Sequence, residues 1–187
     1  MRCSRFMPVL VCVSLGPLIA PYAAAQTIGL YSDVDCQSTT LSVPFPGLPV
    51  DLYVMYSNPE GSSYLDEAEF KIYGLPNEWE YEVIPGALVV EFTGDPVRGP
   101  AARVRLSACM NPGCIELARI RVTPTRVIGT RQVLISGEDN DDVTNCPWTL
   151  QCGARYVTCL TDTRSQLNPG TTAVSFVSWG TIKVLFK

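Results

Sequence analysis

Short stretches in which apolar and polar residues alternate run along most of the chain, and glycine and proline separate them. Successive side chains of a strand point to opposite faces of a sheet, so alternation with a period of two predicts β-strands. The pattern predicts strands at 27–31, 39–43, 50–57, 67–73, 79–84, 88–93, 103–109, 114–122, 131–136, 148–152 and 154–158. Because no interior stretch has a convincing helical period, we expect roughly nine or ten of these short strands to form an all-β antiparallel sandwich. The stretch 50–57 is fairly apolar on both faces, which predicts a central strand.

The most regular pair of stretches lies within 103–122. Each arm alternates, and the sequence Met-Asn-Pro-Gly between the arms is typical of a turn, so the pattern predicts an antiparallel hairpin. In the second arm the apolar residues change parity after Leu117. A β-bulge near Ala118 or Arg119 would bring both halves of this arm to the same face of the sheet.

The first 25 residues have the pattern of an export signal. Arg2 and Arg5 precede an apolar run at 7–20, and three alanines stand directly before Gln26. This arrangement predicts a secretory signal peptide that is cleaved before Gln26, which leaves a domain at 26–170. The run is too short for a stable transmembrane anchor, and no later run is apolar enough to cross a bilayer. We therefore expect an extracellular, cell-surface or periplasmic protein.

The segment 171–187, called the tail below, follows an Asn-Pro-Gly break and ends on large apolar residues. Chain ends are normally polar and frayed, so an apolar end predicts a segment that docks on another surface. A helix that begins at Ser178 and a strand at 181–186 both fit the pattern. The tail can dock on its own domain or on a partner, and the docking residues that we expect are Trp179, Ile182, Leu185 and Phe186.

Cysteine usage agrees with export. The chain beyond residue 25 keeps an even number of cysteines, and such a set in an exported protein predicts three disulfides. The sequence leaves their pairing open. A zinc site is not favoured, because the chain has no histidine and no Cys-x-x-Cys pair. The cysteines are Cys36, Cys109, Cys114, Cys146, Cys152 and Cys159.

Charge and residue usage exclude several classes of function. Without the signal peptide the chain carries 12 basic and 18 acidic residues, a net charge of −6, which argues against a nucleic-acid partner. The absence of histidine excludes Ser-His-Asp and Cys-His nucleophiles and most catalytic zinc sites. A carboxylate pair, as in glycoside hydrolases, is the chemistry that remains. Glu78, Glu80, Glu82 and Glu91 are available, but alternating glutamates are typical of the solvated face of a strand.

An acidic loop at 138–142 is the one candidate metal site. Asp139, Asp141 and Asp142 offer the carboxylate oxygens that Ca²⁺ prefers. The loop lacks the spacing and the glycine of an EF-hand, and most acidic loops are simply solvated. We expect no cofactor, with Ca²⁺ as the alternative at this loop.

Three aromatic residues form a candidate ligand platform. Tyr73, Trp79 and Tyr81 lie close together in the sequence, and two of them share a parity on the stretch 79–84. Aromatic rings of this kind can stack on a sugar, but an alternating aromatic face also packs readily on a core.

The chain resembles a set of uncharacterised exported proteins of environmental bacteria. The resemblance is carried by the strand Ile28-Gly29-Leu30-Tyr31, by Cys36, by Ala108-Cys109 after the turn Gly94-Asp95-Pro96, and by the ending Trp179-Gly180-Thr181-Ile182-Lys183-Val184-Leu185-Phe186-Lys187. It implies a cohesin-like or immunoglobulin-like sandwich and brings no catalytic residue. Cys114, a second cysteine close to Cys109, departs from the usual pattern of the set.

Together these observations predict an exported, non-enzymatic binding, adhesion or assembly module, with a protein or polysaccharide at the cell surface as its partner. The alternative is a carbohydrate-binding module or a carboxylate-based glycosidase. Exposed aromatic side chains on a concave face, or two convergent carboxylates, would favour the alternative.

The first prediction concerns export. When the full chain is produced in a bacterium with a working secretion pathway, the exported protein should begin at Gln26, because the three alanines before it form the cleavage site. N-terminal sequencing and intact mass of the exported protein measure this directly. Retention of residues 1–25 on the exported protein would contradict the prediction.

Overall fold

The computed structural model describes residues 26–43, 45–59, 61, 64–111, 113–126, 128–138, 146–154, 157–160 and 163–168. Three predicted features lie outside these residues: the signal peptide at 1–25, the candidate calcium ligands Asp139, Asp141 and Asp142, and the tail with Trp179, Ile182, Leu185 and Phe186.

The described residues form twelve strands and no helix. Each predicted strand overlaps an observed one, although several begin or end at other residues and part of the predicted strand at 154–158 lies outside the described residues. Strand β12 is an additional strand that the pattern did not predict. The strands are β1 (Thr27–Tyr31), β2 (Thr40–Leu41), β3 (Val50–Ser57), β4 (Leu65–Tyr73), β5 (Glu80–Pro85), β6 (Val89–Thr93), β7 (Ala102–Met110), β8 (Cys114–Thr123), β9 (Arg131–Ser136), β10 (Trp148–Gln151), β11 (Val157–Cys159) and β12 (Thr163–Leu167).

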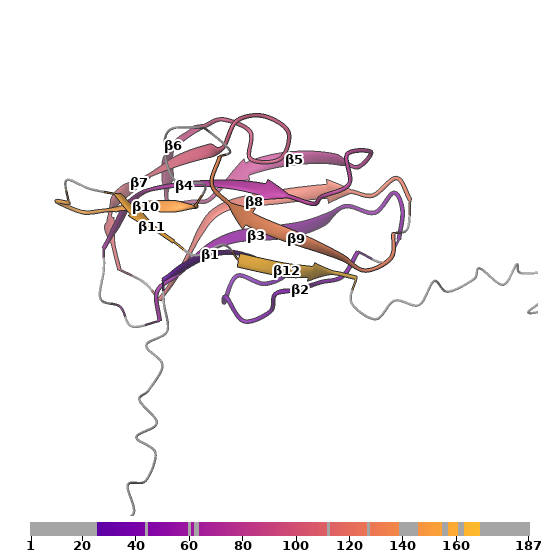
Figure 1. Cartoon of the computed structure of the whole chain (residues 1–187), viewed down its shortest axis with the longest axis horizontal. Helices are drawn as coiled ribbons and strands as arrows, with labels where there is room; N and C mark the ends of the chain where they lie inside the picture. Colours follow the sequence, from indigo (N-terminus) through magenta and orange to yellow (C-terminus); the bar gives the residue numbers. More distant parts are fainter. Residues whose placement is uncertain are drawn as a thin grey trace, which may run out of the picture.

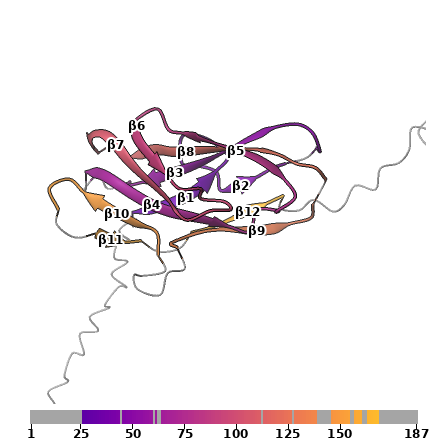
Figure 2. The same ribbon diagram turned by 90° about the horizontal axis from the view of Figure 1, so that it is seen from above.

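The strands lie in two layers, which Figure 1 and Figure 2 show from two directions. One layer, the small sheet, has four strands in the order β1-β3-β8-β5. The other, the large sheet, has eight strands; it follows the path β11-β10-β4-β9-β12-β2, with β7 paired to β4 and β6 paired to β7. Only β12 and β2 pair in parallel; the other pairs are antiparallel. The expected central position of β3 is confirmed, since it lies between β1 and β8.

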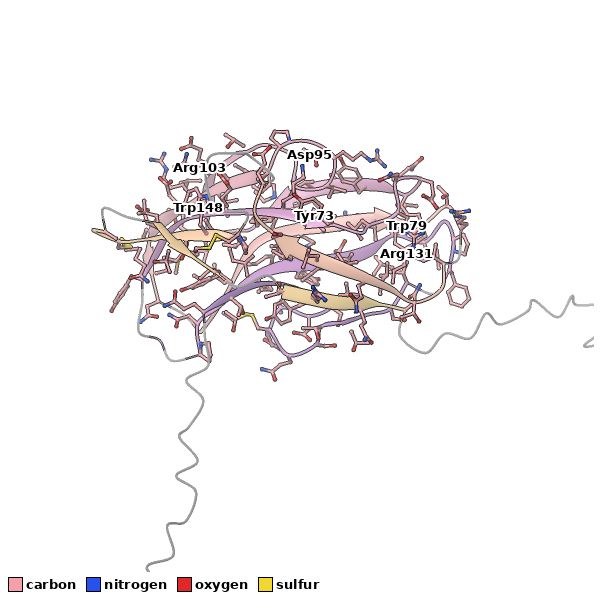
Figure 3. The ribbon with its side chains drawn as sticks, viewed as in Figure 1. Tyr73, Trp79, Asp95, Arg103, Arg131 and Trp148 are labelled. Atoms are coloured by element: carbon pink, nitrogen blue, oxygen red, sulfur yellow. A yellow bond between two sulfur atoms is a disulfide. The ribbon has the colours of Figure 1, made fainter. Side chains whose placement is uncertain are left out.

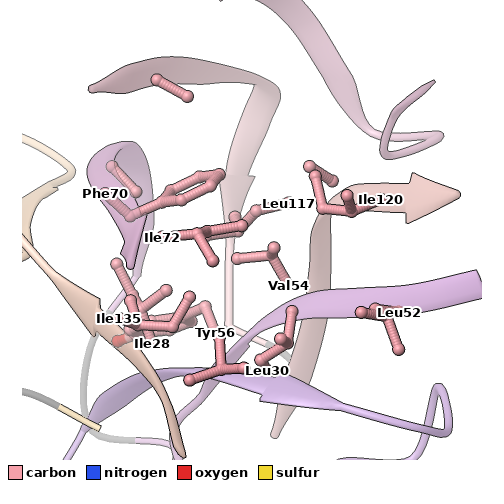
Figure 4. Packing of buried hydrophobic residues seen from close by; sticks show 14 of the residues in the cluster. Ile28, Leu30, Leu52, Val54, Tyr56, Phe70, Ile72, Leu117, Ile120 and Ile135 are labelled. Carbon is pink, nitrogen blue, oxygen red and sulfur yellow. The ribbon is translucent and has the colours of Figure 1, made fainter. Parts of the chain in front are cut away.

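A single apolar cluster fills the space between the sheets (Figure 4). Leu52 and Val54 of β3 point into it from the small sheet, and Phe70 and Ile72 of β4 point into it from the large sheet. Each of these side chains is at most 2% exposed. Full burial of one such side chain contributes about 1.5–3 kcal/mol, so the alternation of the strands is the main source of stability.

The predicted hairpin within 103–122 is wrong. Its two arms, β7 and β8, lie in different sheets: β7 pairs with β4 and β6, whereas β8 pairs with β3 and β5. Residues 111–113 therefore carry the chain from the large sheet to the small sheet. The pattern could not reveal this, because two arms with one apolar face each can meet either edge to edge or through their side chains across a core.

The turn sequence in this crossing binds another loop rather than closing a hairpin. The side-chain amide of Asn111 donates to the carbonyl of Gly61, and the amide of Asn58 donates to Oδ1 of Asn111 over 3.3 Å. The backbone N–H of Asn58 donates to the carbonyl of Gly113 over 2.9 Å. The crossing is thus fastened to the connection between β3 and β4.

The predicted bulge in β8 is present. Val54 pairs with Ala118 and Met55 pairs with Glu116, so Leu117 is the extra residue on β8. Leu117 and Ala118 are both fully buried. The bulge therefore turns two consecutive side chains toward the core and restores the apolar face of the strand.

The prediction of three disulfides is confirmed, and the structure supplies their pairing. Cys36 bonds Cys114, Cys109 bonds Cys152, and Cys146 bonds Cys159, with Cα–Cα distances of 6.2, 5.8 and 5.7 Å. Cys109 and Cys114 lie on either side of the crossing at 111–113, yet each bonds a different part of the chain. The crossing is thereby tied to the β1–β2 connection on one side and to the turn after β10 on the other.

Strand β12 contacts the small sheet through hydroxyl groups. Thr163 Oγ1 donates to the carbonyl of Ile28 over 2.5 Å, and Ser165 Oγ donates to the carbonyl of Leu30 over 2.7 Å. Both carbonyls belong to β1, which has only β3 as a strand partner. These two bonds join the sheets along this side of the sandwich.

Asn168 holds the end of β12 in place. Its Oδ1 accepts the backbone N–H of Val43 over 2.6 Å, and its Nδ2 donates to the carbonyl of Ile128 over 3.3 Å. The residue is only 2% exposed and has a positive φ of 51°, a conformation that asparagine tolerates better than most residues. One side chain therefore joins β12 to the segments that follow β2 and β8.

We predict that Asn168→Ala lowers the free energy of unfolding by about 2–4 kcal/mol, because it leaves two buried backbone groups without their partner and places alanine at a positive φ. Asn168→Gly should cost less, since glycine removes the amide but accepts the conformation. Urea unfolding measures both. The matched control is Gln166→Ala at the exposed position of the same strand; an equal effect of the alanine variants at 166 and 168 would contradict the role of Asn168.

Candidate functional site

The outer face of the small sheet carries a regular array of charged and aromatic side chains, called the charged face below. Alternation sends Leu52 and Val54 into the core and turns their neighbours Asp51 and Tyr53 outward. Strand pairing places Asp51 of β3, Arg121 of β8 and Glu82 of β5 in one row. The next row contains Tyr31, Tyr53 and Arg119. The charged face consists of Tyr31, Asp51, Tyr53, Glu82, Glu116, Arg119 and Arg121.

The first row is held together by Arg121. Its Nε donates to Oδ1 of Asp51 over 2.8 Å, and its Nη2 donates to Oδ2 over 3.2 Å, so the pair is bidentate. Glu82 lies 3.9 Å from Nη1 of the same guanidinium. The hydrogen bond from Arg121 holds the pKa of Asp51 below its ordinary value. A bidentate pair fixes the plane of the guanidinium, which stays 42% exposed.

The second row is organised around Arg119. Its guanidinium carbon lies 5.2 Å from the centre of the Tyr53 ring, a distance at which a cation attracts an aromatic face. Its Nη2 lies 3.3 Å from Oε1 of Glu116, and Nη1 lies 3.7 Å from Oδ2 of Asp51. Both arginines of the charged face are therefore oriented by neighbours before any partner binds.

Tyr31 completes the second row because its neighbour is glycine. A Cβ at Gly29 would lie 2.8 Å from Cε2 of the Tyr31 ring, which is closer than real contacts allow. The ring thus lies over the backbone of β1, next to Tyr53 on β3. Substitution of Gly29 would displace this ring from the charged face.

A disulfide-bonded loop borders the charged face. Cys36 bonds Cys114, which has the same outward parity on β8 as Glu116. The loop at 32–38 is folded around Asp33, whose carboxylate accepts the backbone N–H groups of Asp35, Gln37 and Ser38 over 3.1, 3.0 and 2.8 Å. These bonds, that from Gln37 foremost, lower the pKa of Asp33. An ionised Asp33 therefore stabilises the loop conformation in which these three N–H groups are bonded to its carboxylate.

The charged face can bind a partner but offers little to a reaction. Its charged groups are paired and partly exposed. Arginine and tyrosine are enriched at protein–protein interfaces, where they supply hydrogen bonds and apolar contact at a low cost in conformational entropy.

The outer face of the large sheet carries a second charged area, a groove of about 330 Å³. Arg103 bridges Glu67 over 2.9 Å and Arg105 bridges Glu91 over 2.8 Å. The guanidinium carbon of Arg103 also lies 5.1 Å from the centre of the Trp148 ring. Figure 3 labels both residues at the same end of the sandwich. The groove is lined by Glu67, Glu91, Thr93, Arg103, Val104 and Arg105.

The predicted aromatic platform of Tyr73, Trp79 and Tyr81 is not formed. Trp79 is 2% exposed and belongs to the core cluster, so its ring is closed to a ligand. The hydroxyl of Tyr73 donates to the carbonyl of Gly137 over 3.1 Å. The alternative interpretation of these aromatic residues, packing on the core, is confirmed for Trp79.

Tyr81 is part of a structural contact. Its hydroxyl donates to Oδ2 of Asp95 over 2.5 Å, and the guanidinium carbon of Arg98 lies 4.6 Å from its ring centre. Burial and the bond to Asp95 raise the pKa of Tyr81 to about 12. Arg98 also donates to the carbonyls of Asn77 and Trp79 over 2.7 and 2.6 Å, so this cluster fastens the loop after β6 to the start of β5.

Three of the four candidate catalytic carboxylates, those of Glu78, Glu82 and Glu91, are paired with arginines. Glu78 lies 2.5 Å from Nη2 of Arg126, and a bond from its own backbone N–H together with this pair lowers the pKa of Glu78. Glu82 and Glu91 lie beside arginines of the two outer faces. The acid of a glycoside hydrolase needs a raised pKa. Within the described part of the chain, every resolved shift of a carboxyl pKa is downward.

Among the described residues, no three side chains of the metal-ligating types come together. The candidate calcium ligands Asp139, Asp141 and Asp142 lie outside that part, so the calcium site stays a prediction. The described residues also contain no helix that is long and apolar enough to cross a membrane.

Sequence analysis missed the arginines of the charged face. Arg119 and Arg121 have the outward parity of β8 after the bulge, and Asp51 has the outward parity of β3. This signal was available in the sequence. The signal points to a site only when β3 and β8 are known to be neighbours, and the predicted hairpin had paired β8 with β7 instead.

Comparison with known proteins identifies the fold. No protein-family model and no curated protein matches the sequence. The sixth cohesin of scaffoldin B from Acetivibrio cellulolyticus, solved in complex with a mutant dockerin, matches with a TM-score of 0.50 and 12% identity over 76% of this chain and 97% of that chain. The cohesin module of a family 33 glycoside hydrolase from Clostridium perfringens matches with a TM-score of 0.47 and 10% identity over 77% and 98%. The match to the Acetivibrio cellulolyticus cohesin, together with the two-sheet all-β architecture, confirms the predicted fold class, a cohesin-like β-sandwich.

The next prediction tests the pair in the first row. The pKa of Asp51 is lower in the folded protein, so the pair stabilises the fold above the unfolded pKa of about 4, and this contribution is lost as the pH falls through the folded value. Asp51→Asn should lower stability at pH 7 and should flatten its fall between about pH 5 and 2.

Urea midpoints across this pH range measure the effect. The matched control is Asp66→Asn on β4, whose carboxyl lies outside the charged face. Equal pH profiles for the Asp51 variant and the wild type would show that the pair contributes nothing to stability.

Proposed function

We propose that this protein is an exported, non-catalytic module that binds a partner protein through the charged face, for adhesion or assembly at the cell surface or in the periplasm. The observation that carries the proposal is the orientation of Arg119 and Arg121 by Asp51, Glu116 and Tyr53 on an otherwise polar sheet face. Side chains that are oriented in advance lose little conformational entropy when a partner binds.

The charged face indicates the chemistry of the partner. Its first row alternates acidic and basic groups, and Arg119 of the second row lies beside Glu116. A complementary surface therefore carries both charges, with carboxylates opposite Arg119 and Arg121 and a basic group opposite Glu82. The ring of Tyr53 supplies apolar contact beside these charges, whereas the ring of Tyr31 is buried, with only 8% exposed. An interface of this composition weakens as salt concentration rises, mainly through slower association.

The comparisons support a protein partner. The cohesin of Acetivibrio cellulolyticus was solved in complex with a dockerin, so a sandwich of this fold can hold another protein. A shared fold alone does not carry a function, and the argument for this chain therefore depends on its own charged face.

A polysaccharide partner is the alternative, and the structure gives it less support. Sugars stack on exposed aromatic rings, yet Trp79 and Trp148 are only 2% and 9% exposed. The groove on the large sheet is polar and lined by arginine–carboxylate pairs. A glycan array on the protein is therefore one arm of the test.

The test uses the mature protein, immobilised and exposed to surface proteins of the bacterium that produces it. We expect a bound protein that mass spectrometry identifies and whose Kd is then measured in isolation. The double variant Tyr53→Ala, Arg121→Glu should weaken this Kd at least about tenfold, since it removes one ring and reverses one charge of the charged face.

The matched control is Arg105→Glu, a charge reversal at an arginine on the opposite sheet whose side chain is 52% exposed, against 42% for Arg121. Urea unfolding of each variant checks that the fold is intact. The same Kd for the double variant and the wild type would refute the charged face as the site. Binding of a polysaccharide with no protein partner would refute the proposed class of ligand.

A further inference from the structure

The connection between β2 and β3 ends in an exposed apolar loop, called the apolar tip below. Phe45 and Leu48 are 55% and 59% exposed, and Pro46 and Pro49 beside them are exposed as well. Gly47 turns the loop with a φ of 79°, and its N–H donates to the carbonyl of Pro124 over 2.8 Å. The loop thus has a defined attachment and presents its large side chains to solvent, which is typical of a surface that another element covers.

The chain leaves the sandwich beside this apolar tip. Strands β12 and β2 pair in parallel, with Leu167 opposite Leu41, so the chain beyond β12 sets out in the same direction as the chain beyond β2. Asn168 fixes this direction, because its N–H donates to the carbonyl of Leu41 over 2.7 Å and its Oδ1 accepts the N–H of Val43. Phe45 lies two residues beyond Val43 and at most about 14 Å from Leu41.

The tail has the composition and the reach to cover the apolar tip. Its large apolar side chains are Trp179, Ile182, Leu185 and Phe186. The segment 169–178 spans up to about 33 Å when extended, which exceeds the distance to the tip. Burial against the apolar tip would remove the apolar side chains of the tail from water, together with Phe45 and Leu48.

We propose that the tail packs on the apolar tip of its own chain. This inference is independent of the proposed function, because the apolar tip precedes the start of β3 and the charged face lies on the outer side of the small sheet. Packing of the tail would cover Phe45 and Leu48 and would bury the tail's own rings, so that the two segments stabilise each other.

The other exposed apolar residues are less suited to receive the tail. Val34 and Tyr64 lie beside cysteines at the opposite end of the sandwich: Val34 precedes Cys36, and the carbonyl of Tyr64 accepts the N–H of Cys152. Leu88 and Val90 lie at β6, on the far side of β7 and β4 from β12. A nearby site closes a shorter loop and loses less chain entropy, which favours the apolar tip.

The test is a double-mutant cycle in the mature, full-length protein. One variant is Trp179→Ser, Phe186→Ser in the tail, another is Phe45→Ser, Leu48→Ser in the tip, and the third combines them. We expect each pair of substitutions to lower the urea midpoint by roughly 0.5–1 M, and the combination to lower it no further than either pair alone. The matched control is Val90→Ser, an exposed apolar residue away from the tip, whose effect should add to that of the tail variant.

A second measurement keeps the result clear. A fluorescent peptide with the sequence of residues 178–187 should bind the tail variant and should not bind the variant that combines tail and tip substitutions. The proposal would be overturned if the combined variant lowered the urea midpoint by the sum of the two separate effects. It would also be overturned if the peptide bound equally well with and without the substitutions in the apolar tip. Coupling that appears only at concentrations where sedimentation shows a dimer would also overturn it, in favour of docking on a second copy.

Discussion

The longer described strands each turn apolar side chains to one side, and the structure depends on burying the apolar faces of two sheets against each other. Because the cluster between the sheets takes the inward side chains, the outward side chains of the same strands are polar or charged. The charged face is a direct consequence. Asp51 and Tyr53 point outward for the same geometric reason that Leu52 and Val54 point inward.

The local and the long-range parts of the fold were unequally predictable. Alternation is a local signal, and it located most strands well. It says nothing about which sheet a strand joins, so β7 and β8 were expected to pair and instead lie in opposite sheets. Strand β12 escaped notice because its inward positions include Thr163 and Ser165, whose hydroxyl groups bond to β1 where an apolar residue was expected. Disulfide pairing was equally unpredictable, because it depends on which distant segments the sheets bring together.

The candidate site shows the same division. The aromatic residues that stand out in the sequence have structural roles: Trp79 is in the core and Tyr81 is bonded to Asp95. The residues that organise the charged face look unremarkable in the sequence, because single arginines on a strand are common. Arg119 and Arg121 gain their significance from the neighbours that strand pairing supplies, namely Tyr53 and Asp51.

The hydroxyl bonds from β12 to β1 limit how this protein can recognise others. An exposed strand edge offers rows of unpaired N–H and C=O groups, which let another chain add a strand or let copies aggregate. On β1 the carbonyls of Ile28 and Leu30 are already bonded to Thr163 and Ser165. A partner that approaches this side cannot extend the small sheet without displacing those bonds. At the β1 edge of the small sheet, a partner therefore has side chains rather than backbone groups to contact, and side chains can change by substitution while the sandwich is kept.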